Sequence, residues 1–551
     1  MENSTISLKI NRKMRQIKGL NIILTFLLIL FAFKLDAQHR WAANFGQPNH
    51  YESVHDLLED YDKGYFLVGY HVITNISWNG WDIKTNINGE MLWNQNLIHP
   101  EGRQGKAACN DDIGNKYIAG IDFSNDNNWP FLIKFNACGE KLWCTIYQDL
   151  DYNFGFPTDI IINENGEIIV LTRFNSNDNI NQVFLLCYNP NGDLLWKRPY
   201  ASRTDHPLIQ LPSCNKLYHF GKDYILSGYC YYPYPDDPNH FWLRPLFVGI
   251  DSLFNEKWIL PFGVSDSIVG ESYSVTPLND TVIIGVGYSF AEQSGYYGRT
   301  STMMFFNHNG EELGFNVIQR DSIAYGTLGN TLIQMEPINE SLFLATAIFG
   351  TSDFFNPYGE LVVDTSGKIY NVQPRPNTDG FSSLIKTFDN KYVIACGINE
   401  PDMDHTDIYL YKINANLEQD TLYTQNFVYD SLCPDPIISG DIDMTNCSVV
   451  QVSIDEAPTP EEYYKSLDAI TVKAYPNPAD EFIRLEYKHT DRHQNIRLQC
   501  YNALGKKVHA EDIVTGQMGS KINVSSWGSG VYMAIISSEG RIVGKVKFVV
   551  K

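Results

Sequence analysis

The chain has 551 residues, more than one compact core usually holds, and a formal charge of −22 at neutral pH. Its apolar content of 44% and aromatic content of 13% are ample for a buried core. Because so acidic a surface repels phosphate groups, we expect no nucleic-acid partner and no binding to anionic membranes through basic patches.

The first 37 residues have the three parts of a signal peptide. Basic residues between Lys9 and Lys18 precede an apolar run at 20–33, and Ala37 supplies a small residue for cleavage. An uncleaved membrane anchor is the alternative, but the run is shorter than the roughly 20 residues that cross a bilayer. We therefore expect the Sec machinery to export the chain and cleavage to follow Ala37, with no integral membrane segment left in the mature protein.

A short hairpin recurs along residues 50–425. It is clearest at 83–93, where a strand enters the turn Asn88-Gly89 and returns to Trp93. The other copies lie at 131–143, 184–196, 247–258, 305–313, 361–369 and 408–422. Gly and Asn supply the positive φ angles that such turns need. Seven copies at similar spacing predict a repeat protein.

Each copy fits within a unit of four short strands. In the first unit we expect these strands at 53–57, 65–70, 81–85 and 91–97. No helical pattern separates the units, so we predict an all-β fold whose residues 38–429 form a seven-bladed β-propeller. The segment 40–45 looks like a fourth strand without its unit, and it could join the last blade and close the ring.

The copy Asn191-Gly192-Asp193-Leu194-Leu195-Trp196 shows the repeated pattern most fully. This strand, turn and Gly-x-x-Leu-Trp pattern resembles the repeats of quinoprotein-like and related bacterial propellers. The resemblance implies a scaffold and no particular cofactor, and we predict none.

Ten cysteines in an exported chain permit disulfides. We expect Cys433 to pair with Cys447, because the two bracket a short polar loop in an acidic linker at 430–469. Cys214 and Cys230 could face each other across neighbouring strands. Two others, Cys187 and Cys396, lie in apolar strand patterns and are expected to pack as small hydrophobic residues.

Residues 470–551 form a second β-rich unit with its own motifs. In chain order these are Tyr475-Pro476-Asn477-Pro478, the turn at Gly505-Lys506, a strand with Gly530 and Tyr532, and Lys545 in the last strand. They resemble the type A C-terminal sorting domain of cargo of the type IX secretion system of Bacteroidota-like bacteria. The resemblance implies a small C-terminal β-sandwich, recognition by the type IX secretion and sorting machinery, and a final location in the medium or on the outer cell surface.

Signatures of catalysis are missing from the sequence. It contains no Gly-x-Ser-x-Gly elbow, His-Glu-x-x-His, phosphate-binding loop or dinucleotide fingerprint. The thirteen histidines are scattered, and His55 beside Asp56 is expected to be a hydrogen-bonded structural residue. Asp-rich loops such as 122–128 lack the EF-hand spacing. We therefore predict no catalytic residue and no metal site, although Asp56 and Asp159 are candidates should a pair of carboxylates meet near the ring axis.

Aromatic residues gather in the longer loops, between the second and third strands of the units. The candidates for ligand contact are Trp78, Trp129, Tyr231, Tyr232, Tyr296 and Phe354. Such rings suit sugar or peptide ligands, and the alternative is that they pack against neighbouring loops. We predict a noncatalytic binding or adhesion protein with a glycan or peptide ligand, and a polysaccharide hydrolase or lyase is the alternative.

Overall fold

A computed structural model describes residues 41–47, 50–73, 77–123, 128–149, 151–176, 181–234, 237–264, 268–293, 296–318, 330–349, 358–399, 405–452, 458–460, 463, 470–488, 496–503, 505–514, 517–538 and 541–551. The predicted signal peptide lies outside these residues. Contacts divide the chain into two compact units, with the main boundary between residues 453 and 454. In the described part of the chain, no helix has the length and apolar character needed to cross a membrane.

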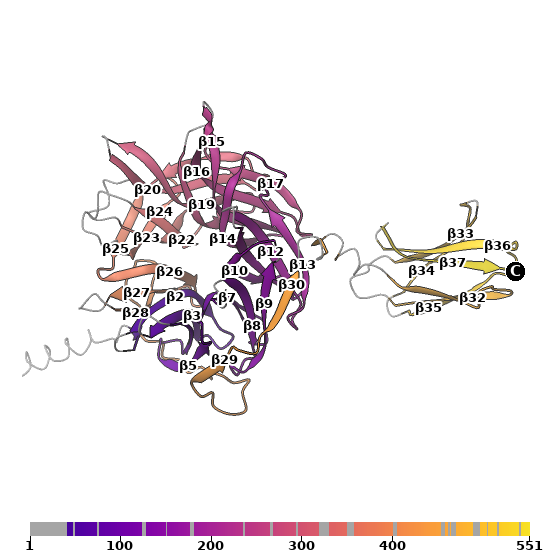
Figure 1. Ribbon diagram of the computed structural model, residues 1–551, viewed down its shortest axis with the longest axis horizontal. Coiled ribbons are helices and arrows are strands. Elements are labelled where there is room, and N and C mark those ends of the chain that lie inside the picture. Colours follow the sequence, from indigo (N-terminus) through magenta and orange to yellow (C-terminus); the bar gives the residue numbers. More distant parts are fainter. Residues whose placement is uncertain are drawn as a thin grey trace, which may run out of the picture. The chain divides into compact units, whose positions relative to one another are not determined.

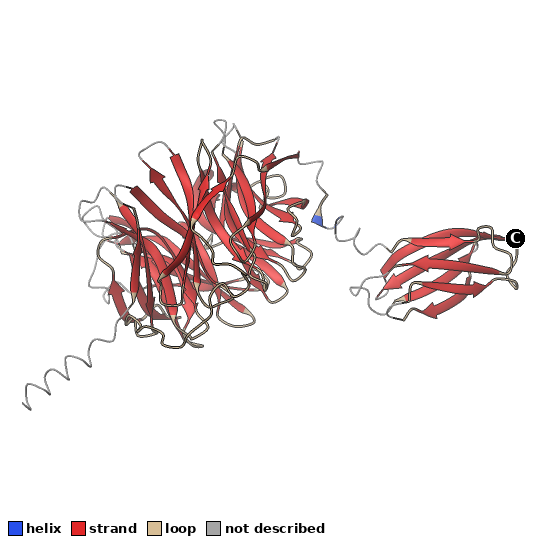
Figure 2. Cartoon of the chain, turned by 90° about the horizontal axis from the view of Figure 1, so that it is seen from below, coloured by secondary structure: helices blue, strands red, loops and turns tan. Residues whose placement is uncertain are grey.

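The first unit consists of four-stranded antiparallel sheets that follow one another around a common axis (Figures 1 and 2). The first sheet contains β2 (His50–Glu59), β3 (Tyr65–Ile73), β4 (Ser77–Thr85) and β5 (Met91–Ile98). The second contains β6 (Arg103–Asn110), β7 (Lys116–Asp122), β8 (Trp129–Phe135) and β9 (Lys141–Asp149), and one parallel bridge between Asn79 and Arg103 joins it to the first.

The next four sheets repeat this order. They contain β10 (Phe154–Ile162), β11 (Ile168–Asn175), β12 (Asn181–Tyr188) and β13 (Leu194–Tyr200); β14 (Gln210–Phe220), β15 (Asp223–Tyr234), β16 (Asp237–Ile250) and β17 (Glu256–Pro261); β18 (Gly270–Pro277), β19 (Val282–Gln293), β20 (Tyr296–Asn307) and β21 (Glu312–Val317); and β22 (Thr331–Pro337), β23 (Leu342–Ile348), β24 (Tyr358–Asp364) and β25 (Ile369–Pro374).

The last four-stranded sheet of this unit takes strands from both ends of the repeat region. It contains β26 (Thr378–Lys386), β27 (Tyr392–Asn399), β28 (Thr406–Ile413) and, beside β28, the N-terminal strand β1 (Ala42–Phe45). In the antiparallel register Ala42 lies opposite Tyr411 and Phe45 lies opposite Ile408. The orphan strand expected near residue 40 therefore pairs with the last four-stranded sheet of the repeat region, as predicted.

The turn glycines explain why the sequence repeats a Gly-x-x-Leu-Trp pattern. Gly192, with φ of +89°, lies so close to Trp143 of the preceding sheet that a Cβ atom would come within 2.8 Å of the indole. Gly310 is packed in the same way against Trp258, and Gly89 against Trp41, which precedes β1. A positive φ and a neighbouring indole both exclude a residue larger than glycine. In these three turns the tryptophan of an adjacent sheet or strand therefore packs directly on the glycine.

Residues 430–452, expected to belong to a linker, return instead to the first two sheets. β29 (Gly440–Asp443) pairs in parallel with β5, and β30 (Ser448–Val452) pairs in parallel with β9. Arg103, 2% exposed, donates hydrogen bonds to the Met444 carbonyl and to the Asp122 carboxylate at 3.0 Å. We call residues 430–452 the return segment.

The predicted Cys433–Cys447 disulfide is wrong. Cys433 bonds to Cys138 and Cys447 bonds to Cys144, with Cα–Cα distances of 5.4 and 4.8 Å. The reason is the path of the return segment. Cys433 lies at the turn before β9 and Cys447 lies at β9 itself, and β29 separates the two cysteines in the sequence. Both bonds fasten the return segment to the turn and the strand of one hairpin.

The suggested Cys214–Cys230 pair is also wrong, because both are buried free thiols. Cys214 lies opposite Gly228 in the β14–β15 register, two residues before Cys230. Cys187 and Cys396 are buried free cysteines in strands, as predicted.

The second unit contains two further sheets that share one core. One sheet contains β31 (Val472–Tyr475), β32 (Phe482–Tyr487) and β35 (Gly519–Asn523). The other contains β34 (Lys507–Asp512), β33 (Arg497–Asn502), β36 (Gly530–Ser538) and β37 (Arg541–Val550). Ile483 and Leu485 of the first sheet pack in one buried cluster with Leu498, Ala534 and Phe548 of the second.

Candidate functional site

A pocket of about 700 Å³ lies in the middle of the first unit, and residues of β2, β6, β10, β14, β18, β22 and β26 line it. These are the first strands of their sheets. In six of them the antiparallel ladder skips one residue at the corresponding place. The skipped residues are His55, Lys106, Thr158, Asn215, Tyr273 and Ile333, and all six line the pocket. A bulge redirects one side chain out of the ladder, so the same irregularity in successive sheets aims these side chains at a common space.

In several sheets the side chain of the residue after the bulge ties one inner strand to the next. The Asp56 carboxylate accepts a hydrogen bond from the Ala108 amide of the second sheet at 2.9 Å and from the Ser383 hydroxyl of the last sheet at 3.3 Å. The Asp159 carboxylate accepts one from the Leu217 amide at 2.8 Å. These bonds hold neighbouring sheets in register around the pocket.

The two candidate catalytic carboxylates therefore belong to the framework, and the structure does not place them together in the pocket. Neither Asp56 nor Asp159 lines it, and none of its described lining residues is an Asp or a Glu. Burial raises the pKa of Asp159, but its partner Lys216, 3.2 Å away, opposes that shift.

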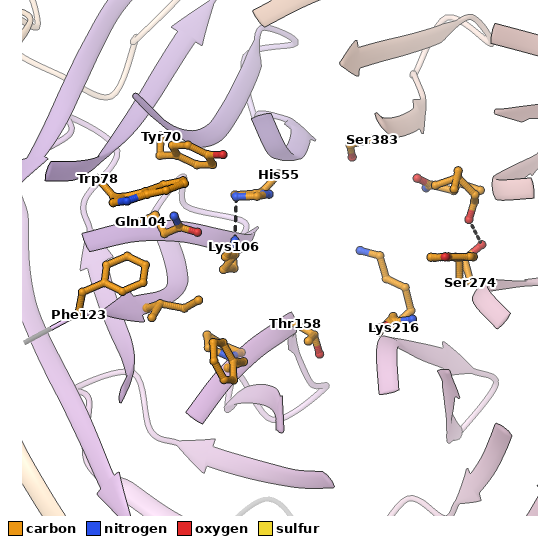
Figure 3. A pocket seen from close by; sticks show the side chains of 17 residues that line it. His55, Tyr70, Trp78, Gln104, Lys106, Phe123, Thr158, Lys216, Ser274 and Ser383 are labelled. Carbon is orange, nitrogen blue, oxygen red and sulfur yellow. Dashed lines mark hydrogen bonds between the residues drawn. The ribbon is translucent and has the colours of Figure 1, made fainter. Parts of the chain in front are cut away.

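Two lysines supply positive charge to the pocket (Figure 3). Burial lowers the pKa of Lys106 to about 8. For Lys216, burial acts in the same direction, but the carboxylates of Asp159 and Asp56 outweigh it and raise the pKa. Both side chains are therefore mainly cationic at neutral pH, in a chain whose formal charge is −22.

His55 lies beside Lys106, with 2.9 Å between Nε2 and Nζ (Figure 3). Burial, followed by the charge of Lys106, lowers the pKa of His55 to about 3. The imidazole is therefore neutral at physiological pH, and its Nε2 accepts a hydrogen bond from the ammonium group. The prediction that His55 is a hydrogen-bonded residue is confirmed, and the structure adds that it lines the pocket.

Aromatic rings form one wall of the pocket beside Lys106 (Figure 3). The rings of Tyr70 and Trp78 lie 4.9 Å apart, and those of Trp78 and Phe123 lie 6.5 Å apart, measured between centroids. Trp78 is 44% exposed, so its indole presents apolar area to the solvent. Rings of this kind offer flat surfaces to a sugar at little cost in conformational entropy.

The other aromatic candidates are distributed differently. Trp129 is 8% exposed and packs in the core of the first unit, so it is no exposed ligand contact. Tyr231 is 37% exposed and Tyr232 is half-buried, both on β15 and outside the pocket lining. The side chain of Tyr296 and all of Phe354 lie outside what the structure describes.

Sequence reasoning missed Lys106, Lys216 and the bulges at Lys106 and Asn215. The available signal was a charged residue in the middle of an otherwise apolar or alternating first strand, as in Gly105-Lys106-Ala107. When the strand register is unknown, such a residue is interpreted as an ordinary solvent-facing residue of the strand.

The motifs of the second unit occupy defined positions in its two sheets. The Asn477 side chain accepts a hydrogen bond from the Val549 amide at 2.9 Å, which ties the Tyr475-Pro476-Asn477-Pro478 segment to the last strand. Tyr532, 6% exposed, donates to the Gly528 carbonyl at 2.6 Å and stacks on Phe548.

Two more motifs of this unit are found in their predicted elements. Gly505 has φ of +74° at the turn before β34, with Lys506 next to it, and the Lys506 amide donates to Asn502 at 2.9 Å. Gly530 begins β36, and Lys545 lies in β37.

Residues 473–551 match the family described as the secretion system C-terminal sorting domain. These residues are a type IX sorting domain. A sorting domain marks a chain as cargo of that secretion system, so the protein interacts with the secretion machinery and is exported to the medium or the outer surface. The sequence-based identification is confirmed.

No protein of curated function matches the chain. Among solved structures, a polysaccharide lyase of family PL25, an ulvan lyase, is 10% identical with a TM-score of 0.42, covering 68% of this chain and 92% of its own. The Trypanosoma rangeli sialidase is 8% identical with a TM-score of 0.37, covering 92% of this chain and 88% of its own. A protein of unknown function from Dyadobacter fermentans is 9% identical with a TM-score of 0.37, covering 61% and 99%. Likeness at this level carries no argument about activity.

Proposed function

We propose that the protein is an exported, noncatalytic binding protein whose first unit is a seven-bladed β-propeller that holds an anionic saccharide in its central pocket. In this proposal residues 1–37 are the signal peptide, 38–429 the propeller, 430–452 the return segment that pairs with its first two sheets, and 470–551 a β-sandwich that directs sorting. The ligand belongs to the outside of the cell, where the sorting domain delivers the chain.

Three contacts support closure of the propeller between its first and last sheets. β1 pairs with β28, the indole of Trp41 packs on Gly89, and the Ser383 hydroxyl donates a hydrogen bond to Asp56. The first contact completes the last sheet, and the other two reach from that sheet to the first, as Trp143 at Gly192 reaches from the second sheet to the third. A closed ring would leave only short, protected sheet edges.

The single observation that carries the binding proposal is the composition of the pocket. It combines Lys106 and Lys216 with the exposed ring of Trp78, and Gln104 and Asn215 add amide groups. Lysines attract carboxylate or sulfate groups, aromatic rings stack on sugar faces, and amides bond to hydroxyls. An acidic saccharide uses all three, whereas a neutral one leaves Lys106, whose hydrogen-bond partner His55 is neutral, without an opposite charge.

One observation favours a second function, that of a lyase acting on an acidic polysaccharide. The Lys106 amine has a pKa lowered to about 8 by burial and is bonded to neutral His55, so a substantial fraction is unprotonated slightly above neutral pH. A general base with a pKa near the working pH removes protons efficiently. A two-carboxylate hydrolase is less well supported, because Asp56 and Asp159 are bonded to backbone amides of neighbouring sheets.

An array of acidic and neutral oligosaccharides, together with acidic peptides, tests the proposal on the purified mature chain. We expect binding to acidic saccharides, no binding to their neutral counterparts, and no change in ligand size after long incubation. Accumulation of unsaturated uronate products, followed by ultraviolet absorbance, would favour the lyase. Binding to peptides alone would contradict the saccharide proposal.

A further inference from the structure

Three residues of the first sheet bring potential metal ligands together on the side of the sheet away from the pocket. His50 and Glu52 alternate along β2, and Glu52 lies directly opposite His71 of β3. Alternate residues of a strand and directly opposed residues of an antiparallel pair share one face of a sheet. One ligand atom from each of the three lies within 4.8 Å of the others.

This cluster is distinct from the central pocket. Tyr70, which lines the pocket, is the neighbour of His71 in β3 and therefore points to the opposite face. His71 stacks on Trp81 at 5.8 Å with an angle of 17° between the rings. Trp81 shares a buried cluster with Trp41 and Phe45 at the N-terminus and with Ile408 of β28, which places the cluster beside the seam between the first and last sheets.

The imidazole of His71 is buried without hydrogen bonds. It is 2% exposed, and neither of its ring nitrogens has a hydrogen-bond partner in the described structure. A buried polar atom without a partner is costly to the folded state, so such an atom requires an explanation. Stacking on Trp81 accounts for the position of the ring but leaves both nitrogens unsatisfied.

The neighbouring groups complete a suitable set of ligands. The Glu52 side chain is fully buried, and its Oε1 atom accepts a bond from the Gln47 amide at 3.2 Å and lies 3.8 Å from Nδ1 of His50. In the register of β3 and β4, Asn79 lies opposite His71 on the same face.

We propose that His50, Glu52 and His71 bind a Zn²⁺ ion that stabilises the seam between the first and last sheets. Two imidazoles and one carboxylate are a ligand set that zinc takes in proteins, with a fourth position filled by water or another oxygen. Zinc–ligand bonds of about 2.0–2.1 Å place tetrahedral ligand atoms roughly 3.3 Å apart, so the three side chains need to move inward by about 1 Å. This site does not depend on the saccharide proposal.

The test uses the tag-free mature chain after treatment with a chelator and dialysis. Calorimetric titration with Zn²⁺ should give one ion per chain, thermal melting should shift upward with added Zn²⁺, and Co²⁺ should give a tetrahedral visible spectrum. Glu52→Gln and His50→Gln should each weaken Zn²⁺ binding by more than about tenfold, since both remove a direct ligand. The control is His308→Gln, which changes an exposed histidine on a turn and should leave binding unchanged.

His71→Ala tests the buried ligand, with the metal-free melt of each variant recorded first. If that variant fails to fold, the half-buried His50 supplies the equivalent test. A folded wild-type chain that takes up no Zn²⁺ would overturn the proposal. Equal uptake by wild type and Glu52→Gln would overturn it as well, because the ion would then lie elsewhere.

Discussion

At the scale of single residues, two tryptophans show why a ligand contact and a core residue look alike in the sequence. Trp78 and Trp129 both stand at the start of a third strand. In the second sheet, however, Trp129 lies opposite Asp122, and in the first sheet the corresponding pair is Asn79 opposite His71. The counterpart of Trp129 in the first sheet is therefore Asn79, and Trp78 is one residue away from that position. A shift of one residue moves a side chain to the other face of a strand. The sequence predicts the loop but not that shift.

This difference predicts opposite effects of two substitutions. Trp78→Ala should weaken saccharide binding by about 1 kcal/mol or more and leave the melting temperature nearly unchanged, because the ring is exposed at the pocket. Trp129→Ala should lower the free energy of unfolding by about 3–5 kcal/mol, because it leaves a cavity in the core. Calorimetric titration and chemical denaturation measure the two effects. An unaffected titration for Trp78→Ala would remove this ring from the site.

The Lys106 ammonium predicts how binding depends on pH. Burial lowers its pKa to about 8, so the charge that attracts an anion is present below that pH and lost as the pH rises through it. Affinity for an acidic saccharide should therefore fall between about pH 7 and pH 9. Titrations at both values measure the fall, and Lys106→Arg, which keeps its charge, is the control. An equal fall in that variant would assign the effect to another group.

At the scale of elements, the hairpins were predictable and the long-range pairings were not. The predicted strand at 65–70 lies within β3, and the turn at Asn88-Gly89 forms with φ of +77° at the glycine. These elements depend on local signals: alternation, apolar runs and residues that accept positive φ. Strands β29 and β30 depend on parallel partners more than 300 residues away, at Gln95 and Thr145, and nothing local identifies them. Cysteine connectivity is equally undetermined by sequence.

The N-terminal strand gives an element-scale prediction. Deleting residues 41–47 removes β1 and the Trp41 indole that packs on Gly89, so the free energy of unfolding should fall by roughly 3 kcal/mol or more. Asn44→Ala, an exposed position on the same strand, is the matched control. Denaturant unfolding measures both, and an unchanged transition in the deletion would argue against closure by β1.

The return segment gives a second prediction at this scale. Cys138→Ser with Cys433→Ser should lower the free energy of unfolding by about 2–5 kcal/mol, because that bond joins residues 295 positions apart and restricts the unfolded chain. Cys144→Ser with Cys447→Ser should have a similar effect. Peptide mapping without reduction identifies the bonds directly. Recovery of a Cys433–Cys447 peptide would contradict the pairing described above.

At the scale of the whole molecule, the sorting domain was recognisable from its own sequence, because its motifs stand in a fixed order from Pro476 to Lys545. The central pocket was not, since it is assembled from single bulged residues of strands spread from residue 55 to residue 383. The sequence predicted the four-stranded units that surround the pocket. Which side chains line the pocket depends on the register of the first strand of each sheet, and the repeat pattern does not predict that register.

Deleting residues 470–551 tests the role of the second unit in transport. The truncated chain should accumulate in the periplasm, because it keeps the predicted signal peptide and loses the sorting domain. Cell fractionation with an antibody against the first unit measures its location, and the intact chain is the control. Normal amounts of truncated protein at the surface or in the medium would contradict the sorting role.

The central claim is that the pocket binds an acidic saccharide through its two lysines and its aromatic wall. Calorimetric titration of an acidic oligosaccharide into wild type and into the double variant Lys106→Met, Lys216→Met tests it most directly. Lys257→Met, which removes an exposed lysine paired with Asp223 at 2.6 Å, is the control for charge alone. We predict an affinity at least about tenfold weaker for the double variant and unchanged for the control, since each lost charge contact costs on the order of 1 kcal/mol or more. Equal affinity in wild type and the double variant would contradict the claim.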